Sequence, residues 1–211
     1  MKNINFKFTK LIFSLILIFI SFKYTLNCHA SRSQNSFRPT MTRIEEGDVS
    51  PGRSEESYEN IRVSVDWSLF KDTVPQTNKV FAKALRENII PRTITVFEKL
   101  IKVRRLIHTL KFPEVFKCER YNVPETLRTE GVKGKDIVIF PIIEESGEFI
   151  KERIEAAALY CSQSTLDGRP LMGFIEYRPD LLAGDEYHLD YHIWLSIHEL
   201  MHVFAFNDSL F

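Results

Sequence analysis

Residues 136–143 constrain the fold more than any other stretch of this chain. The run Asp136-Ile-Val-Ile-Phe-Pro-Ile-Ile143 has the length of a strand and no polar side chain after its first residue. An apolar strand of this kind needs a covering layer on each face of its sheet. We therefore predict a strand that is covered on both faces.

Three further segments are typical of strands. Residues 61–67 alternate apolar and polar side chains, which predicts a half-buried strand. Residues 155–161 and 171–177 flank the turn signal Asp167-Gly168, which predicts two strands joined by a loop. Residues 110–130 predict a loop-rich connection because they hold two prolines and no sustained periodicity.

Apolar side chains recur at helical spacing between residues 80 and 101, with Pro91 in the middle. Proline removes one hydrogen bond of a helix and clashes with the preceding turn. We predict one long helix that is interrupted or kinked near Pro91, or two short helices. The basic run at residues 102–105 is the expected solvated end.

The N-terminus has the layout of a secretory signal peptide. Lys2, Lys7 and Lys10 precede an uncharged run over residues 11–22, and the small residue Ala30 offers a cleavage site. A helix of that run would span roughly 18 Å, whereas a bilayer core measures about 30 Å, so a permanent membrane anchor is disfavoured. We expect secretion or display at the cell surface.

We divide the chain into a signal peptide at residues 1–30, a pro-segment or flexible linker at 31–60, and one globular unit at 61–211. Residues 31–60 are rich in Ser, Arg, Glu, Pro and Gly, which favours loose packing. Without the four lysines of the signal peptide, 24 basic residues face 28 acidic ones. This mildly acidic balance disfavours a nucleic-acid-binding surface.

The pentapeptide His198-Glu-Leu-Met-His202 lies in an apolar run over residues 193–206. On a helix, His198 and His202 project from one face and can hold one metal ion. Zinc with two histidines and one more ligand keeps an open position for water, whose proton Glu199 can accept. This pattern indicates peptide hydrolysis, although chance produces it on the order of once per hundred chains of this length.

Other histidines are weaker candidates for metal ligands. His188 and His192 also stand four apart, but no carboxylate-and-water arrangement accompanies them. We interpret them as polar residues at the start of the helix, with Asp185 or Asp190 as its N-cap. His108 stands alone and is interpreted as a surface or core histidine.

The segment from His198 to Phe211 resembles the active-site helix of leishmanolysins, the metzincin-type zinc peptidases of the M8 class. Residues 157–161, 168–173 and 177–179 are similar to the segment before that helix. The resemblance covers roughly residues 61–211.

The resemblance implies an α+β fold: a metzincin-like N-terminal subdomain, with a twisted mixed sheet, a long helix and a C-terminal zinc-binding helix. It implies Zn²⁺ on His198 and His202, with Glu199 as the catalytic base. Protein or peptide substrates are implied, together with membrane or cell-surface association. In this family the strand before the zinc helix lies at the sheet edge, so residues 171–177 are expected to hold an extended peptide.

The chain departs from the family at two points. Ala205 replaces a glycine, and alanine with positive φ would cost on the order of 1 kcal/mol. The family's third histidine and methionine-containing turn follow a long insertion, so we expect a chain that stops at Phe211 to be incomplete. Asp208 stands where metzincins without the insertion place their third histidine, and it is the alternative third ligand.

Three cysteines leave the pairing open. If Cys28 leaves with the signal peptide or stays free, Cys118 and Cys161 are a candidate disulfide. The alternatives are two buried thiols, or a Cys28 that occupies the zinc in a latent precursor, as in leishmanolysin-like proteins.

The predicted function is a zinc-dependent metalloendopeptidase. One alternative is a catalytically inactive secreted homologue that acts in binding or cell adhesion. A second is a disulfide-held binding module with a chance motif, which would bind no zinc.

Overall fold

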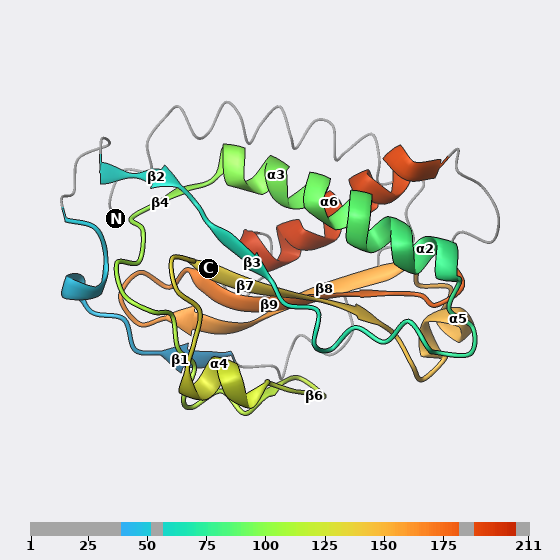
Figure 1. Ribbon diagram of the computed structural model, residues 1–211, viewed down its shortest axis with the longest axis horizontal. Coiled ribbons are helices and arrows are strands. Elements are labelled where there is room, and N and C mark those ends of the chain that lie inside the picture. Colours follow the sequence, from blue (N-terminus) through green and yellow to red (C-terminus); the bar gives the residue numbers. More distant parts are fainter. Residues whose placement is uncertain (1–38, 52–56, 182–187, 206–211) are drawn as a thin grey trace.

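The computed structural model describes residues 39–51, 57–181 and 188–205. A five-stranded sheet with the order β1-β8-β9-β7-β3 lies at its centre. Helices cover one face of this sheet, and a loop-rich layer covers the other (Figure 1). None of the helices in these three stretches is both long and apolar enough to cross a bilayer.

The strands of the central sheet are β1 (Thr40–Thr42), β3 (Val63–Val65), β7 (Ile137–Ile143), β8 (Ala156–Ser164) and β9 (Pro170–Tyr177). The short strands outside it are β2 (Glu59–Asn60), β4 (Lys102–Val103), β5 (Lys117–Cys118) and β6 (Tyr121–Asn122). The helices are η1 (Glu46–Asp48), α2 (Lys79–Ala84), η3 (Leu85–Ile89), α3 (Ile90–Leu100), α4 (Glu125–Thr129), α5 (Glu148–Glu152) and α6 (Leu189–Phe204).

Strand β7 is buried along its whole length, as its uniform apolar sequence predicts. It pairs in parallel with β3 on one side and with β9 on the other. Strand β8 runs antiparallel to β9, so the predicted pair of strands around Asp167-Gly168 is confirmed. The sheet is therefore mixed, and the predicted fold class is confirmed.

The predicted helix around Pro91 is a continuous helical segment with a change of pitch. Helices α2 and α3 are joined by η3, a π-helix in which the Ile90 N–H bonds to the Leu85 carbonyl. This wider turn immediately precedes Pro91, which has no N–H to continue the α-helical pattern. The predicted interruption is confirmed.

Two apolar clusters fill the space on either side of the sheet. Helices α2, α3 and α6 pack on one face, where Phe97 stacks on Phe204 with ring centroids 4.6 Å apart. The segment from 104 to 132 covers the other face. The disulfide between Cys118 and Cys161 ties that segment to β8 and confirms the predicted pairing.

Residues 39–51 are packed against the sheet, although they lie within the predicted pro-segment or flexible linker. Strand β1 pairs in parallel with residues 162–164 of β8. Ile44 and Val49 are buried, and the Ser50 N–H donates to the Arg105 carbonyl at 2.8 Å. Over these residues the expectation of a loosely packed chain is wrong, because its few apolar side chains complete the second cluster. The division into pro-segment and catalytic subdomain stays a prediction.

Candidate functional site

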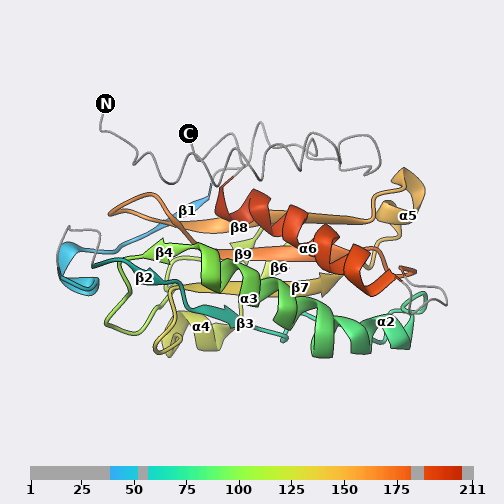
Figure 2. The ribbon, with the colours of Figure 1, turned by 90° about the horizontal axis from the view of Figure 1, so that it is seen from above.

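Helix α6 presents one face to the sheet and carries the HExxH motif. Its buried side chains are those of His192, Leu195, Ser196, Ile197, Glu199, Leu200 and Val203. On the other side, half of the Trp194 side chain is exposed. Figure 2 shows that α6 lies next to α3 on the same face of the sheet, over β8 and β9.

The two ends of α6 differ from their predictions. His188 is the N-cap residue, and Asp190 lies inside the first turn, where a negative charge favours the helix dipole. Asp190 is therefore not the predicted cap, and Asp185 lies outside the described residues. Ala205 ends the helix with φ of −150°, so the expected cost of a left-handed alanine does not arise.

Gly173 allows α6 to lie directly on β9. An ideal Cβ built on Gly173 would come within 2.6 Å of a Val203 methyl and 2.9 Å of the Leu159 carbonyl oxygen. The absence of a side chain therefore sets the distance between the helix and the sheet. This role of Gly173 was not predicted, although a glycine inside an apolar strand is a signal of close approach.

We expect Gly173→Ala to lower the free energy of unfolding by about 1–3 kcal/mol, because the added methyl overpacks the contact with Val203. Denaturant unfolding would measure the loss. Gly47→Ala is the matched control, since no atom lies within 4 Å of a Cβ at Gly47 and its stability should change little. Equal stability of Gly173→Ala and the parent protein would contradict the close-approach role.

The motif residues meet at one place on α6. The rings of His198 and His202 lie with centroids 5.3 Å apart and an interplanar angle of 82°. Burial, and then the neighbouring His202, lower the pKa of His198 to about 4. Its imidazole is therefore neutral near pH 7, which is the form that binds metals. The Glu199 side chain, between them in sequence, is 2% exposed.

The structure does not bring the other histidines to this motif. His192 is buried among aromatic rings, 5.5 Å from the centroid of Phe81 and 5.3 Å from that of Tyr191. Burial, and then the neighbouring His188, lower the pKa of His192 to about 4. His192 is therefore a neutral histidine in the core. No group of three or more His, Cys, Asp or Glu side chains suited to a metal occurs within 39–51, 57–181 and 188–205.

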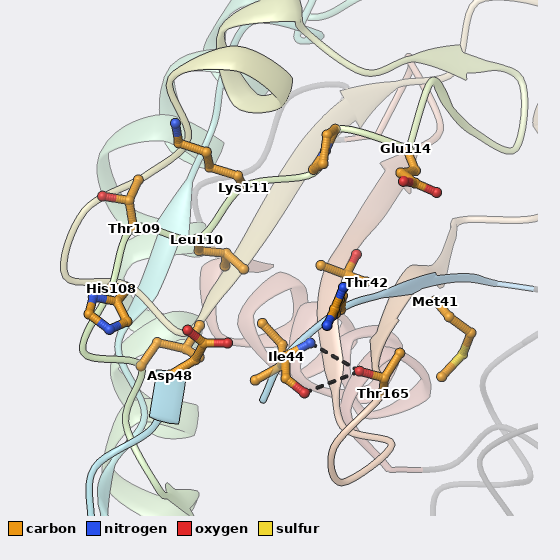
Figure 3. Close-up of a pocket in the computed structure, with 13 residues that line it drawn as sticks. Met41, Thr42, Ile44, Asp48, His108, Thr109, Leu110, Lys111, Glu114 and Thr165 are labelled. Carbon is orange, nitrogen blue, oxygen red and sulfur yellow. Dashed lines mark hydrogen bonds between the residues drawn. The ribbon is translucent and has the colours of Figure 1, made fainter. Parts of the chain in front are cut away.

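A cavity of about 480 Å³ lies away from the motif (Figure 3). It is lined by parts of residues 41–48 and 106–114 and by Thr165, whose hydroxyl accepts from the Ile44 N–H at 3.0 Å. His108 is one of its lining residues. Ile44, Leu106 and Leu110 belong to the apolar cluster on the sheet face opposite α6, so the cavity is separate from the motif.

Strand β9 is central, because β8 and β7 occupy both of its edges. The expectation that residues 171–177 form an edge that holds a peptide is therefore wrong. Strand β7 pairs in parallel with one edge of β9. Strand β8 therefore folds back onto the other edge of β9. The outer edge of β8 is the edge that faces away from β9. Among the described residues, this edge pairs with β1 at residues 162–164, and no described strand pairs with it over residues 156–159.

One polar contact between sheet and helix was not predicted. The Tyr177 hydroxyl at the end of β9 lies 2.7 Å from the Ser196 hydroxyl on α6. Ser196 in turn donates to the His192 carbonyl at 2.7 Å. The sequence signal for this contact is slight: a serine in an otherwise apolar stretch of helix.

The amino-acid sequence is similar to those of known proteins. The profile of the leishmanolysin family, peptidase class M8, matches residues 72–211. The ciliated left-right organizer metallopeptidase of Xenopus laevis is 32% identical over 82 residues, which are 38% of this chain and 11% of that relative. The chain thus matches a small part of the relative's length. Because the family profile spans most of the chain, including β7, β8, β9 and α6, the protein belongs to the leishmanolysin family.

Proposed function

We propose that this chain is the N-terminal part of the catalytic domain of a secreted zinc metalloendopeptidase. The observation that carries the proposal is the clustering of His198, Glu199 and His202 on one helix that packs against a mixed sheet. Family membership supports metallopeptidase chemistry. The zinc site, the base and secretion through residues 1–30 are our assignments.

The donor set on α6 fits zinc. Two imidazoles one helical turn apart are the ligands that an HExxH helix provides. His198 and His202 would hold the ion together with a ligand from outside the described residues. Bound zinc supplies Lewis acidity, which polarises a scissile carbonyl and lowers the pKa of a water molecule.

Glu199 would perform the proton transfers. Glu199 follows a ligand histidine directly in sequence, so its carboxylate would lie beside the attacking water once zinc is bound. One carboxylate oxygen accepts the water proton as the C–O bond forms. The same proton then passes to the nitrogen of the leaving amine as the C–N bond breaks.

The outer edge of β8 is the surface that we assign to the substrate. Over residues 156–159 no described strand pairs with this edge, and there an extended peptide would add as a further strand. Ala157 and Ala158 keep side chains small along this edge. Helix α6 contacts the same strand, which supports this assignment.

Zinc binding tests the metal assignment. We expect His198→Ala or His202→Ala to weaken zinc binding by at least about 100-fold, because each removes a direct ligand. Competition with a chromophoric chelator would measure the affinity. His108→Ala is the matched control, because His108 lies at the separate cavity and should leave the affinity unchanged. Equal zinc binding by all three variants, or none by the parent protein, would favour a homologue that acts in binding or adhesion.

A further inference from the structure

The hydrogen-bond chain from Tyr177 through Ser196 to His192 has a defined direction. A serine hydroxyl holds one hydrogen, and Ser196 donates it to the His192 carbonyl, four residues earlier on α6. The Ser196 oxygen must therefore accept from Tyr177. The phenol of β9 is the donor, and the helix is the acceptor.

This chain of bonds lies in a dry part of the helix–sheet interface. Tyr177 and Ser196 are fully buried, and the Phe81 ring meets Tyr177 edge-on at 5.8 Å. Because both side chains are buried, loss of one hydroxyl would leave the other without this partner, which is costly in a buried site. The contact therefore favours one arrangement of the two elements.

A directional bond fixes what apolar packing leaves loose. The contact of Val203 with Gly173 sets how closely α6 approaches the sheet, but apolar contacts have little orientational preference. A hydrogen bond weakens steeply when its angle changes. The Tyr177–Ser196 bond is therefore suited to fixing the rotation of α6 about its own axis.

Glu199 lies next to this bond. It is three residues after Ser196, on the same buried side of α6. Burial, a hydrogen bond to Ser196 and the charge of Glu199 act on Tyr177, and the first and last of these raise its pKa. A neutral phenol thus stands close to the carboxylate that we assign as the base.

We infer that Tyr177, acting through Ser196, is a positioning residue that fixes the rotation of α6 and thereby the direction of the Glu199 carboxylate. This inference rests on the proposed peptidase function. A carboxylate about 6 Å from the helix axis moves about 2 Å for a rotation of 20°. Misplacement of a catalytic group by about 1 Å can cost on the order of 100-fold in rate.

The histidines respond differently from Glu199 in this account. His198 and His202 sit on the same helix, so a rotation moves both without changing their mutual geometry. The contribution of these two histidines to zinc affinity should therefore change less than the proton transfer when the bond is lost. Proton transfer requires the base to meet a peptide that is bound on another element. The rate of proton transfer should therefore fall when the bond is lost.

The kinetic test compares Tyr177→Phe, Ser196→Ala and the double variant with Phe97→Leu. The last is a control that weakens α6 packing on Phe204 without touching the bond. We expect kcat to fall about tenfold in both single variants and no further in the double variant, with KM within twofold of the parent and a smaller fall in zinc affinity than in kcat. Phe97→Leu should lower Tm and keep kcat. Unchanged kcat in Tyr177→Phe, or an equal fall in Phe97→Leu, would overturn the inference.

A second readout does not depend on activity. In protein labelled with ¹³C-glutamate, the carboxyl resonance of Glu199 is assigned by its loss in Glu199→Gln. We expect Tyr177→Phe and Ser196→Ala to shift this resonance, and Phe97→Leu to leave it in place. An unshifted resonance would refute positioning even in a protein without peptidase activity, whereas a parent protein with the predicted shifts but no zinc-dependent cleavage would refute the proposed function alone.

Discussion

Replacing Glu199 with glutamine is expected to lower kcat for peptide cleavage by about 100-fold to 10,000-fold while zinc stays bound. Glutamine has nearly the same shape, but its amide cannot accept the proton of the attacking water. The histidines are untouched, so zinc affinity should remain within a few-fold of the parent value. Steady-state kinetics and zinc content, measured on the same preparation, would show this separation.

The matched control is Glu87→Gln, which makes the same substitution on an exposed carboxylate of η3. It should leave kcat unchanged. Circular dichroism would show that both variants are folded, which matters because Glu199 is buried. A Glu199→Gln protein that binds zinc and still cleaves peptides at the parent rate would remove Glu199 from the reaction.

Loss of the Cys118–Cys161 disulfide should lower the free energy of unfolding by about 4 kcal/mol. The two cysteines are 43 residues apart in sequence, and closure of a loop of that size removes this much chain entropy from the unfolded state. The bond also holds the segment from 104 to 132 over β7, where Val138 and Phe140 need cover. Alanine is the suitable replacement, because both cysteines are buried and a serine would add an unbonded hydroxyl.

Denaturant unfolding of the double variant Cys118→Ala, Cys161→Ala would measure the loss. The parent protein under reducing conditions is the internal comparison, and it should lose a similar amount. A change of less than about 1 kcal/mol in both would mean that packing alone holds the segment on the sheet.

Elements with a strong local pattern could be predicted from the sequence. The apolar run of β7, the turn between β8 and β9, and the effect of Pro91 on the α2–α3 segment each follow from neighbouring residues. The HExxH motif is likewise local, because a spacing of four residues places His198 and His202 together on any helix.

Features that depend on distant pairing could not be predicted. Strand β1 has three residues and pairs with β8, and a strand so short has no periodicity to detect. The order of strands in the sheet decides which edge is open, and the edge therefore belongs to β8 and not to residues 171–177.

Around the motif, too, features that depend on distant residues could not be predicted from the sequence. Gly173 and Tyr177 act on α6 from β9, across a contact that the sequence does not reveal. The end of the helix at Ala205 also depends on its context, because the residue adopts a negative φ that any amino acid tolerates. The residues of the motif could be predicted from the sequence, whereas the contacts by which the sheet positions α6 could not.

The most direct test of the account is chelator-sensitive cleavage of an unfolded protein substrate by the protein expressed from its complete coding sequence. Cleavage is expected to stop when a chelator removes the metal and to return when zinc is added back. Cleavage that persists without metal, or its absence from a protein with zinc bound at His198 and His202, would contradict the assignment of a zinc peptidase.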